Sequence, residues 1–189
     1  MGVQNVITVV RYLSQRMYMK SILVKLEKTL WKIRMFKKRE TIKQVEEGND
    51  LAPKFDKNGF IPVVTTDAKT GVVLMHAYMN EEALKKTITT KEAHYYSRSR
   101  QSIWHKGKTS GFVQKVTEIK IDDDQDSIWL TVDIGNGASC HVGYRSCFYR
   151  SIPLGPIENG REVEMKFTEK EKKFDPEKVY KGQPNPTKI

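Results

Sequence analysis

Short runs of β-branched and aromatic residues, separated by turn residues, constrain the fold of this chain most strongly. FIPVVTT follows the turn DKNG, and KTG leads into VVLMHAYM, so the first two runs predict a hairpin. Further strand-like runs are HYYSRS, SIWHK, VQKVTEIKI, SIWLTVDI and SCFYRSI. One helix, EEALKKTITT, interrupts them, with Asn80 as its N-cap and Glu81 and Glu82 at its positive end. The sequence therefore predicts an α+β fold, mostly antiparallel β-sheet with one main helix in the body.

The chain of 189 residues suits one domain with extensions, and its 38% apolar content is enough to bury a core. The runs above place the domain at residues 51–153. Residues 1–50 are then a basic N-terminal extension. Residues 154–189 are a charged, proline-punctuated C-terminal extension with one short helical candidate at PEKVY, which we interpret as an extension or as part of a dimer contact.

The N-terminal extension is basic and is predicted to be helical. Residues 1–34 contain seven Lys or Arg and one acid, Glu27, and apolar residues such as Leu23, Leu26 and Leu30 recur with near-helical spacing. Three interpretations remain: a membrane-surface or targeting helix, a helix packed on the body, or translated sequence upstream of a true start at Met35. We favour an upstream sequence or a dispensable helix over a functional anchor.

The net charge of +10 favours an anionic partner, which includes nucleic acid, a membrane surface or a phosphorylated small molecule. No apolar run approaches the roughly 18 residues of a spanning helix. No cleavable secretion signal precedes Cys140 and Cys147, so we expect a cytoplasmic protein whose two cysteines are reduced.

Four carboxylates crowd into the stretch IKIDDDQDSIWL, against the basic trend of the chain. If residues 117–126 stay extended, Asp122, Asp124 and Asp126 share one face, and Asp123 points to the other. Three carboxylates on one face suit a hard divalent ion such as Mg²⁺. The alternative is a solvated hairpin turn, which the residues alone slightly favour.

The segment GASCHVGYRSCFYR, residues 137–150, carries soft and borderline metal ligands. Cys140, His141 and Cys147 suit zinc, and they are one ligand short of a closed structural site. That shortage suits a catalytic metal with an open position for water. The alternative is a pair of buried thiols in strands.

The segment SRSRQSIWHKGKTSG, residues 97–111, gathers cations beside two glycines. Its candidate ligands are Arg98, Arg100, His105, Lys106, Lys108 and Ser110. Arginine forks and the backbone N–H groups of a glycine-rich turn both suit phosphate, and Trp104 offers a stacking surface for a base. A nucleic-acid surface offers the same mixture, and an exposed charged hairpin is a third interpretation.

Taken together, these segments discriminate between the alternative functions better than any one of them does alone. IPVVTTDAKTGVVLMHAYMNEEAL, EAHYYSRSRQSIWHKGKTSG, DDDQD and GASCHVGYRSCFYR, which cover about residues 55–150, resemble the phosphoribosyl-AMP cyclohydrolases of the third step of histidine biosynthesis. The resemblance implies a hydrolase that opens the N1–C6 bond of the purine ring to give the phosphoribosylformimino-aminoimidazole carboxamide ribotide. It also implies Zn²⁺, Mg²⁺ and a homodimer with the active site at the subunit interface, without nucleic acid or membrane.

The resemblance implies roles for individual residues. Asp122, Asp124 and Asp126 would bind Mg²⁺, and Asp123, Cys140 and Cys147 would bind Zn²⁺. The family pattern usually has cysteine at the position of Asp123, so the third zinc ligand is either this carboxylate or a group from elsewhere, such as His141. His105 and His141 are the candidates for proton transfer, and the choice between them stays open. The substrate-binding candidates are Arg98, Arg100, Trp104, Lys106, Lys108, Ser110 and Arg145.

The competing function is a basic nucleic-acid-binding protein with a structural metal.

Overall fold

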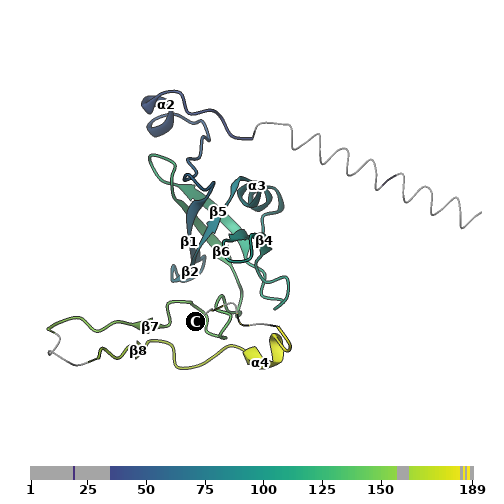
Figure 1. The fold of residues 1–189 in the computed structure, drawn as a ribbon, viewed down its shortest axis with the longest axis vertical. Coiled ribbons are helices and arrows are strands. Elements are labelled where there is room, and N and C mark those ends of the chain that lie inside the picture. Colours follow the sequence, from purple (N-terminus) through teal and green to yellow (C-terminus); the bar gives the residue numbers. More distant parts are fainter. Residues whose placement is uncertain (1–18, 20–34, 157–161, 184, 186, 188–189) are drawn as a thin grey trace, which may run out of the picture. The chain divides into compact units, whose positions relative to one another are not determined.

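The computed structural model describes residues 19, 35–156, 162–183, 185 and 187 (Figure 1). The chain divides into two units, residues 1–38 and 39–189, and the second holds the elements described below. Apart from Met19, the basic helix predicted over residues 1–34 lies outside the described residues. Among the residues that are described, no helix has the length and apolar character needed to cross a bilayer.

The second unit is built on a four-stranded sheet with the order β2-β1-β6-β5 (Figure 1). β1 (Ile61–Asp67) and β2 (Val73–Met79) form the predicted antiparallel hairpin, and β5 (Lys115–Ile121) pairs antiparallel with β6 (Ile128–Asp133). The central strands β1 and β6 run parallel, with Val63 opposite Ile128. The sheet is therefore mixed, and the α+β class is confirmed.

A helix and a second hairpin connect the two halves of this sheet. α3 (Glu81–Thr90) begins where predicted, because Asn80 Oδ1 accepts a hydrogen bond from Ala83 N at 2.9 Å. It leads into β3 (His94–Ser97) and β4 (Ser102–His105), an antiparallel pair. This crossover lets β6 return parallel to β1.

The core lies on one face of the sheet. Side chains at alternate positions of β1 and β6 are buried, as expected when one face of a strand packs on the interior. They are Ile61, Val63, Thr65, Ile128, Leu130 and Val132. Leu84 of α3 and Tyr95 of β3 join them. On the opposite face the Trp129 side chain is exposed, and its indole N–H donates to Thr66 Oγ1 at 2.7 Å.

Short elements flank the sheet. α2 (Ile42–Glu46) precedes it, with a capping box between Thr41 and Gln44. β7 (Arg150–Ser151) pairs with β8 (Lys166–Phe167), and α4 (Pro176–Val179) confirms the helix predicted at PEKVY.

The strand predicted over SCFYRSI is mostly wrong, because only its end lies in β7. Ser146 Oγ donates to Val73 O at 2.7 Å and accepts from Phe148 N at 2.8 Å. These side-chain bonds replace the backbone ladder that a strand would need, since a serine hydroxyl competes with the backbone for partners.

Candidate functional site

The four aspartates form a turn rather than a continued strand. β5 ends at Ile121, and the chain turns through residues 122–127 before β6 begins. Asp122 Oδ1 accepts hydrogen bonds from Asp126 N and Ser127 N at 2.9 Å each. The argument from strand alternation is therefore wrong, and the hairpin turn is the observed conformation. The turn itself gathers the carboxylates.

The gathered carboxylates are those of Asp122, Asp124 and Asp126, and each offers one oxygen within 4.8 Å of the other two. Such a set fits a hard divalent cation, which prefers oxygen ligands. Asp123 is exposed on the same turn. We call residues 122–127 the acid turn.

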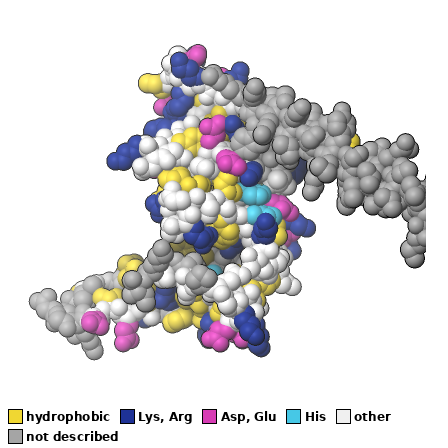
Figure 2. Space-filling view, turned by 45° about the vertical axis from the view of Figure 1, so that its right-hand side comes forward, with side chains coloured by type: hydrophobic (Ala, Val, Ile, Leu, Met, Phe, Trp, Pro, Cys, Tyr) yellow, Lys and Arg dark blue, Asp and Glu magenta, His cyan; other side chains and the backbone are white. Residues whose placement is uncertain are grey.

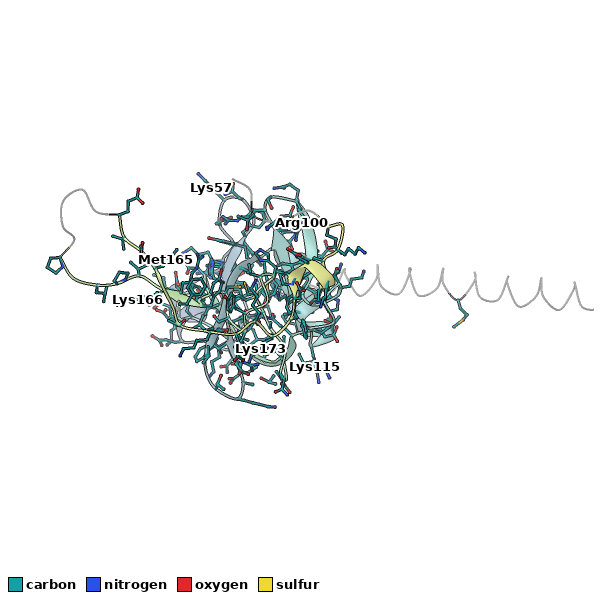
Figure 3. The ribbon with its side chains drawn as sticks, turned by 90° about the horizontal axis from the view of Figure 1, so that it is seen from below. Lys57, Arg100, Lys115, Met165, Lys166 and Lys173 are labelled. Atoms are coloured by element: carbon teal, nitrogen blue, oxygen red, sulfur yellow. The ribbon has the colours of Figure 1, made fainter. Side chains whose placement is uncertain are left out.

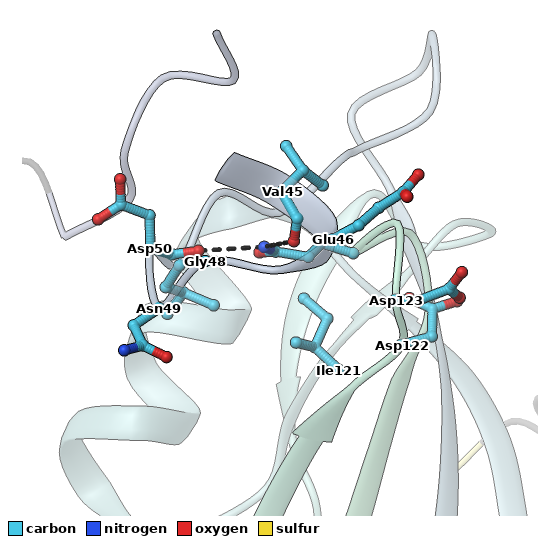
Figure 4. A pocket seen from close by; sticks show the side chains of 10 residues that line it. Val45, Glu46, Gly48, Asn49, Asp50, Ile121, Asp122 and Asp123 are labelled. Atoms are coloured by element: carbon cyan, nitrogen blue, oxygen red, sulfur yellow. Dashed lines mark hydrogen bonds between the residues drawn. The ribbon is translucent and has the colours of Figure 1, made fainter. Parts of the chain in front are cut away.

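Gln125 ties the acid turn to the segment before β1. Its backbone has a φ of 58°, a left-handed conformation that is uncommon for glutamine. Its buried side chain accepts from Ala52 N at 2.8 Å and donates to Val45 O and Asp50 O at 3.0 Å each (Figure 4). A shallow pocket of about 350 Å³ lies between residues 45–51 and the acid turn. Gln125 therefore fixes the turn in the conformation that gathers the carboxylates.

Lys54 lies against the acid turn. Its Nζ is 2.9 Å from Asp126 Oδ2 and 3.1 Å from Asp124 Oδ2. The hydrogen bond from Lys54 holds the pKa of Asp126 below its ordinary value. One ammonium group therefore offsets part of the repulsion between adjacent carboxylates.

The second group of metal-ligating residues is the loop 139–147, which we call the Cys loop. Cys140 is buried and Cys147 is exposed, and the Cys147 thiol hydrogen-bonds to that of Cys140. This bond lowers the pKa of Cys140 to about 6 and raises that of Cys147. The pair therefore loses its first proton readily, as zinc ligation by thiolate requires.

His141, the third candidate on the Cys loop, is half-buried. Burial lowers its pKa, so the imidazole is neutral at neutral pH, and its side chain hydrogen-bonds to Asn185. A neutral imidazole is able either to ligate a metal or to accept a proton.

A buried polar network lies under the Cys loop, and sequence reasoning did not identify it. Tyr95 OH is 2.8 Å from Thr65 Oγ1 and donates to Gln114 Oε1 at 2.7 Å. Gln114 Nε2 in turn donates to Ser139 Oγ at 2.9 Å. These four side chains are all buried. The network positions Ser139, the residue before Cys140, and so fixes the start of the Cys loop.

Lys106 belongs to this buried region. Its ammonium group donates to the Ser139 carbonyl oxygen, its side chain is buried, and burial lowers its pKa. Gly107, which follows it, has a φ of 86°, and a Cβ there would lie 2.2 Å from the backbone of Phe112. Only glycine fits this turn, which directs Lys106 inward. In this structure Lys106, predicted to bind phosphate, lies beneath the Cys loop instead of on the surface.

The remaining predicted phosphate ligands lie on or beside the β3–β4 hairpin. Arg98, Arg100 and Lys108 are exposed. The Arg98 guanidinium lies 3.9 Å from the centre of the Tyr78 ring, and Arg100 lies 5.8 Å from that of Trp104. Ser110 Oγ accepts from Phe112 N at 3.4 Å. These three exposed cations are accessible to an anion that binds from solvent.

His105 is paired with a carboxylate. Its Nε2 lies 2.8 Å from Glu92 Oε2, within ion-pair distance although without hydrogen-bond alignment. Its ring stacks on His94 with centroids 4.4 Å apart. Figure 2 shows histidine side chains together on one face, with acidic side chains beside them. A carboxylate that orients an imidazole is an arrangement suited to proton transfer.

Arg145, predicted to bind substrate, is engaged in an internal ion pair. Its Nη2 lies 2.6 Å from Asp67 Oδ2, and Asp67 is only 1% exposed. Arg145 Nη1 also donates to the carbonyl oxygens of Gly135 and Gly137 at 3.0 and 3.2 Å. In this structure Arg145 therefore links residues 135–137, which lead into the Cys loop, to the end of β1.

Glu169, in the C-terminal extension, also holds the Cys loop. Its Oε2 accepts from Arg145 N at 2.8 Å and its Oε1 from Ser146 N at 2.9 Å. For a zinc ion held by the two thiols, we expect Glu169→Ala to lower the affinity by about 10- to 100-fold, the usual effect of losing a residue that orients a metal ligand. Competition with a chromogenic chelator measures this affinity. Glu171→Ala, an exposed carboxylate on the same segment, is the control and is expected to bind zinc like the wild type.

The acid turn and the Cys loop lie at opposite ends of the sheet. The acid turn leads into the start of β6, whereas Cys147 N donates to Leu74 O of β2 at 2.7 Å, near the ends of β1 and β6. Leu74 lies two strands across from β6 and about three residues along from Ile128, which separates the two loops by about 10 Å in each direction at the usual spacings. An ion held by Cys140 and Cys147 at about 2.3 Å therefore lies beyond the reach of Asp123 in the same chain.

Comparison with known proteins points to one family. A family model described as phosphoribosyl-AMP cyclohydrolase matches residues 75–149. Proteins named phosphoribosyl-AMP cyclohydrolase are similar over most of the chain. That of Rhodopseudomonas palustris (strain TIE-1) is 56% identical over 136 residues, which cover 72% of this chain and 88% of the relative. Those of Nitrobacter winogradskyi and Rhizobium rhizogenes are 49% and 50% identical over 139 residues, with 93% and 91% of each relative covered.

Proposed function

Because the chain belongs to the phosphoribosyl-AMP cyclohydrolase family, we propose that it opens the purine ring of phosphoribosyl-AMP by adding water across the N1–C6 bond, the third step of histidine biosynthesis. The observation that carries this proposal is the pairing of the Cys140 and Cys147 thiols, which the fold brings together within one loop. Free cysteines suit a reducing compartment, so we place the reaction in the cytoplasm.

Cys140 and Cys147 would hold zinc, because thiolate is a favoured zinc ligand. Zinc supplies a bound water whose pKa is about 7 in favourable sites, and thus a nucleophile at neutral pH. The Tyr95–Gln114–Ser139 network holds the start of the loop, and Glu169 holds its end. The protein therefore provides a preorganised thiol pair.

Asp122, Asp124 and Asp126 would hold magnesium. Their oxygens are gathered by the turn before any ion binds, and Asp122 is oriented by two backbone N–H groups. The exposed acid turn leaves room for waters and substrate oxygens, which Mg²⁺ usually keeps among its ligands.

The β3–β4 hairpin and its flanking turn would bind the substrate. Arg98, Arg100 and Lys108 are exposed cations suited to its two phosphates, with Ser110 beside them and Trp104 as a stacking surface. Lys106 and Arg145 are held in internal contacts, so we propose that they shape the Cys loop and do not contact phosphate directly.

Proton transfer would fall to a histidine. His105 is oriented by Glu92 and stacked on His94. His141 lies on the Cys loop, next to Cys140 in the chain, and is neutral at neutral pH. We propose His141, next to the thiols that would hold zinc, as the proton-transfer group of the Cys loop, and His105 as a second proton carrier on the β3–β4 hairpin.

The active site would lie between two subunits of a homodimer. A single chain holds the acid turn and the Cys loop at opposite ends of its sheet. In a two-fold dimer, a contact between the acid turn of one subunit and the Cys loop of its partner occurs twice, so both sites would be completed. Asp123 of the partner subunit would then complete the zinc site. Large apolar side chains around β7 and β8 are exposed and offer a contact surface: Phe148, Ile152, Leu154, Met165 and Phe167.

Ring opening by the purified protein tests the proposed function. Phosphoribosyl-AMP is added before and after treatment with a chelator, and turnover is followed by the change in ultraviolet absorption as the purine ring opens. We expect turnover to be lost after chelation and to return only when both Zn²⁺ and Mg²⁺ are added. Absence of turnover in metal-replete, folded protein would contradict the proposed function.

A further inference from the structure

We propose that Lys54 is a built-in cation that competes with the divalent metal for the acid turn, and so sets the affinity of that turn for metal. The inference rests on the proposed function, in which the acid turn holds magnesium. It assigns a role to a residue outside the motifs that carry the family resemblance.

The geometry places Lys54 and a metal ion on the same oxygens. Lys54 Nζ lies 2.9 Å from Asp126 Oδ2 and 3.1 Å from Asp124 Oδ2. Magnesium binds oxygen at about 2.1 Å, so an ion on these atoms would lie within about 5 Å of the ammonium group. Two positive charges that close repel one another, and the oxygens have only a limited set of lone pairs to share.

The backbone of Lys54 is held in place, so its side chain has to move when a metal ion binds to the acid turn. Lys54 N donates to Gln125 O at 2.7 Å, and the Gln125 side chain holds Ala52 N at 2.8 Å. The Lys54 side chain is 50% exposed, so rotation of its bonds carries the ammonium group into solvent. Lys54 therefore lowers the affinity for metal without blocking the site.

The same contact has an opposite effect in the metal-free protein. Asp122, Asp124 and Asp126 are drawn together by the turn, and their charges repel. Lys54 offsets part of this repulsion while no metal is bound. Loss of the ammonium group is therefore expected to strengthen metal binding and, in the absence of metal, to weaken the fold.

The test compares Lys54→Met with Lys57→Met. Both substitutions remove one positive charge from the same segment, but Lys57 is exposed at the periphery of the body (Figure 3), and among the ion pairs of the described residues it is Lys54 that reaches the acid turn. Titration with Mn²⁺, followed by the loss of its free electron paramagnetic resonance signal, and calorimetry with Mg²⁺ give the affinities. We expect Lys54→Met to bind either ion about three- to tenfold more tightly, and Lys57→Met to bind like the wild type.

Thermal unfolding supplies a second measurement. In chelator Lys54→Met is expected to unfold at a lower temperature than Lys57→Met, and added Mg²⁺ is expected to raise its midpoint more steeply. Unchanged or weaker metal affinity in Lys54→Met, while the wild type binds metal, would overturn the role of Lys54 alone. If Asp124→Asn bound Mn²⁺ as the wild type does, this result would contradict both the assignment of the acid turn as a metal site and the role proposed for Lys54.

Discussion

Two inactive variants, Asp124→Asn and Cys147→Ala, are expected to recover about a quarter of wild-type turnover when their subunits are mixed. Asp124 belongs to the acid turn and Cys147 to the Cys loop, at opposite ends of one sheet. If each active site takes the acid turn from one subunit and the Cys loop from the other, a mixed dimer has one intact site and one doubly damaged site. Random exchange makes half of the dimers mixed, which gives about a quarter of the sites.

The matched control mixes Asp124→Asn with Asp126→Asn. Both changes fall on the acid turn, so no combination of subunits restores an intact site, and turnover is expected to stay at the level of the single variants. Subunits are exchanged by brief dissociation in denaturant, and native mass spectrometry confirms that mixed dimers form. Mixed dimers without recovered turnover would mean that the acid turn and Cys loop do not meet across the interface.

Replacing Asp67 by alanine is expected to lower the free energy of unfolding by about 3 kcal/mol, the usual effect of removing one partner from a buried ion pair. Asp67 is 1% exposed and accepts from Arg145 at 2.6 Å and from Thr70 Oγ1 at 2.8 Å. Its loss leaves the Arg145 guanidinium without its carboxylate. Urea unfolding of the single variants and of Asp67→Ala with Arg145→Ala gives the coupling energy, which we expect to exceed about 1 kcal/mol.

The same carboxylate gives a pH dependence. Burial alone would raise the pKa of Asp67, but the hydrogen bonds from Arg145 and Thr70 outweigh it and hold the pKa below its ordinary value. Its contribution is therefore fully present above the unfolded pKa, about 3.9, and is lost as the pH falls through the lower folded value. The stability of Asp67→Ala should fall less steeply than that of the wild type below about pH 4. Parallel acid-unfolding curves would contradict this assignment.

Local signals predicted the elements that depend on neighbouring residues. The β1–β2 hairpin follows from KTG, and α3 begins at the Asn80 cap. The parallel pairing of β1 and β6 was not predictable, because nothing in either strand specifies a partner about 65 residues away. The strand around Phe148 was mispredicted, since Ser146 gives its hydrogen bonds to β2 and to its own neighbour.

The candidate site was predicted by residue type more than by position. Three aspartates of the acid turn do lie together, and so do the two cysteines, but the structure reveals the residues that hold them. Lys54, Gln114 and Glu169 look like ordinary polar residues in the sequence, because their contacts are made across the fold. Gln125 was a weak sign of a special position, because a glutamine stands in a tight acidic turn where glycine or asparagine is more common. The structure shows that this residue has the left-handed conformation.

The parallel pairing at the centre of the sheet also has a consequence for how the chain folds. Val63 pairs with Ile128, so the chain must close a loop of about 65 residues before its two central strands meet. Such distant pairing slows folding, and during synthesis β1 and β2 emerge well before β6 is available. The acid turn comes immediately before β6 and the Cys loop soon after it. The contacts that anchor both candidate metal sites to earlier parts of the chain, those of Gln125 and Ser146, therefore form late, after these segments have emerged.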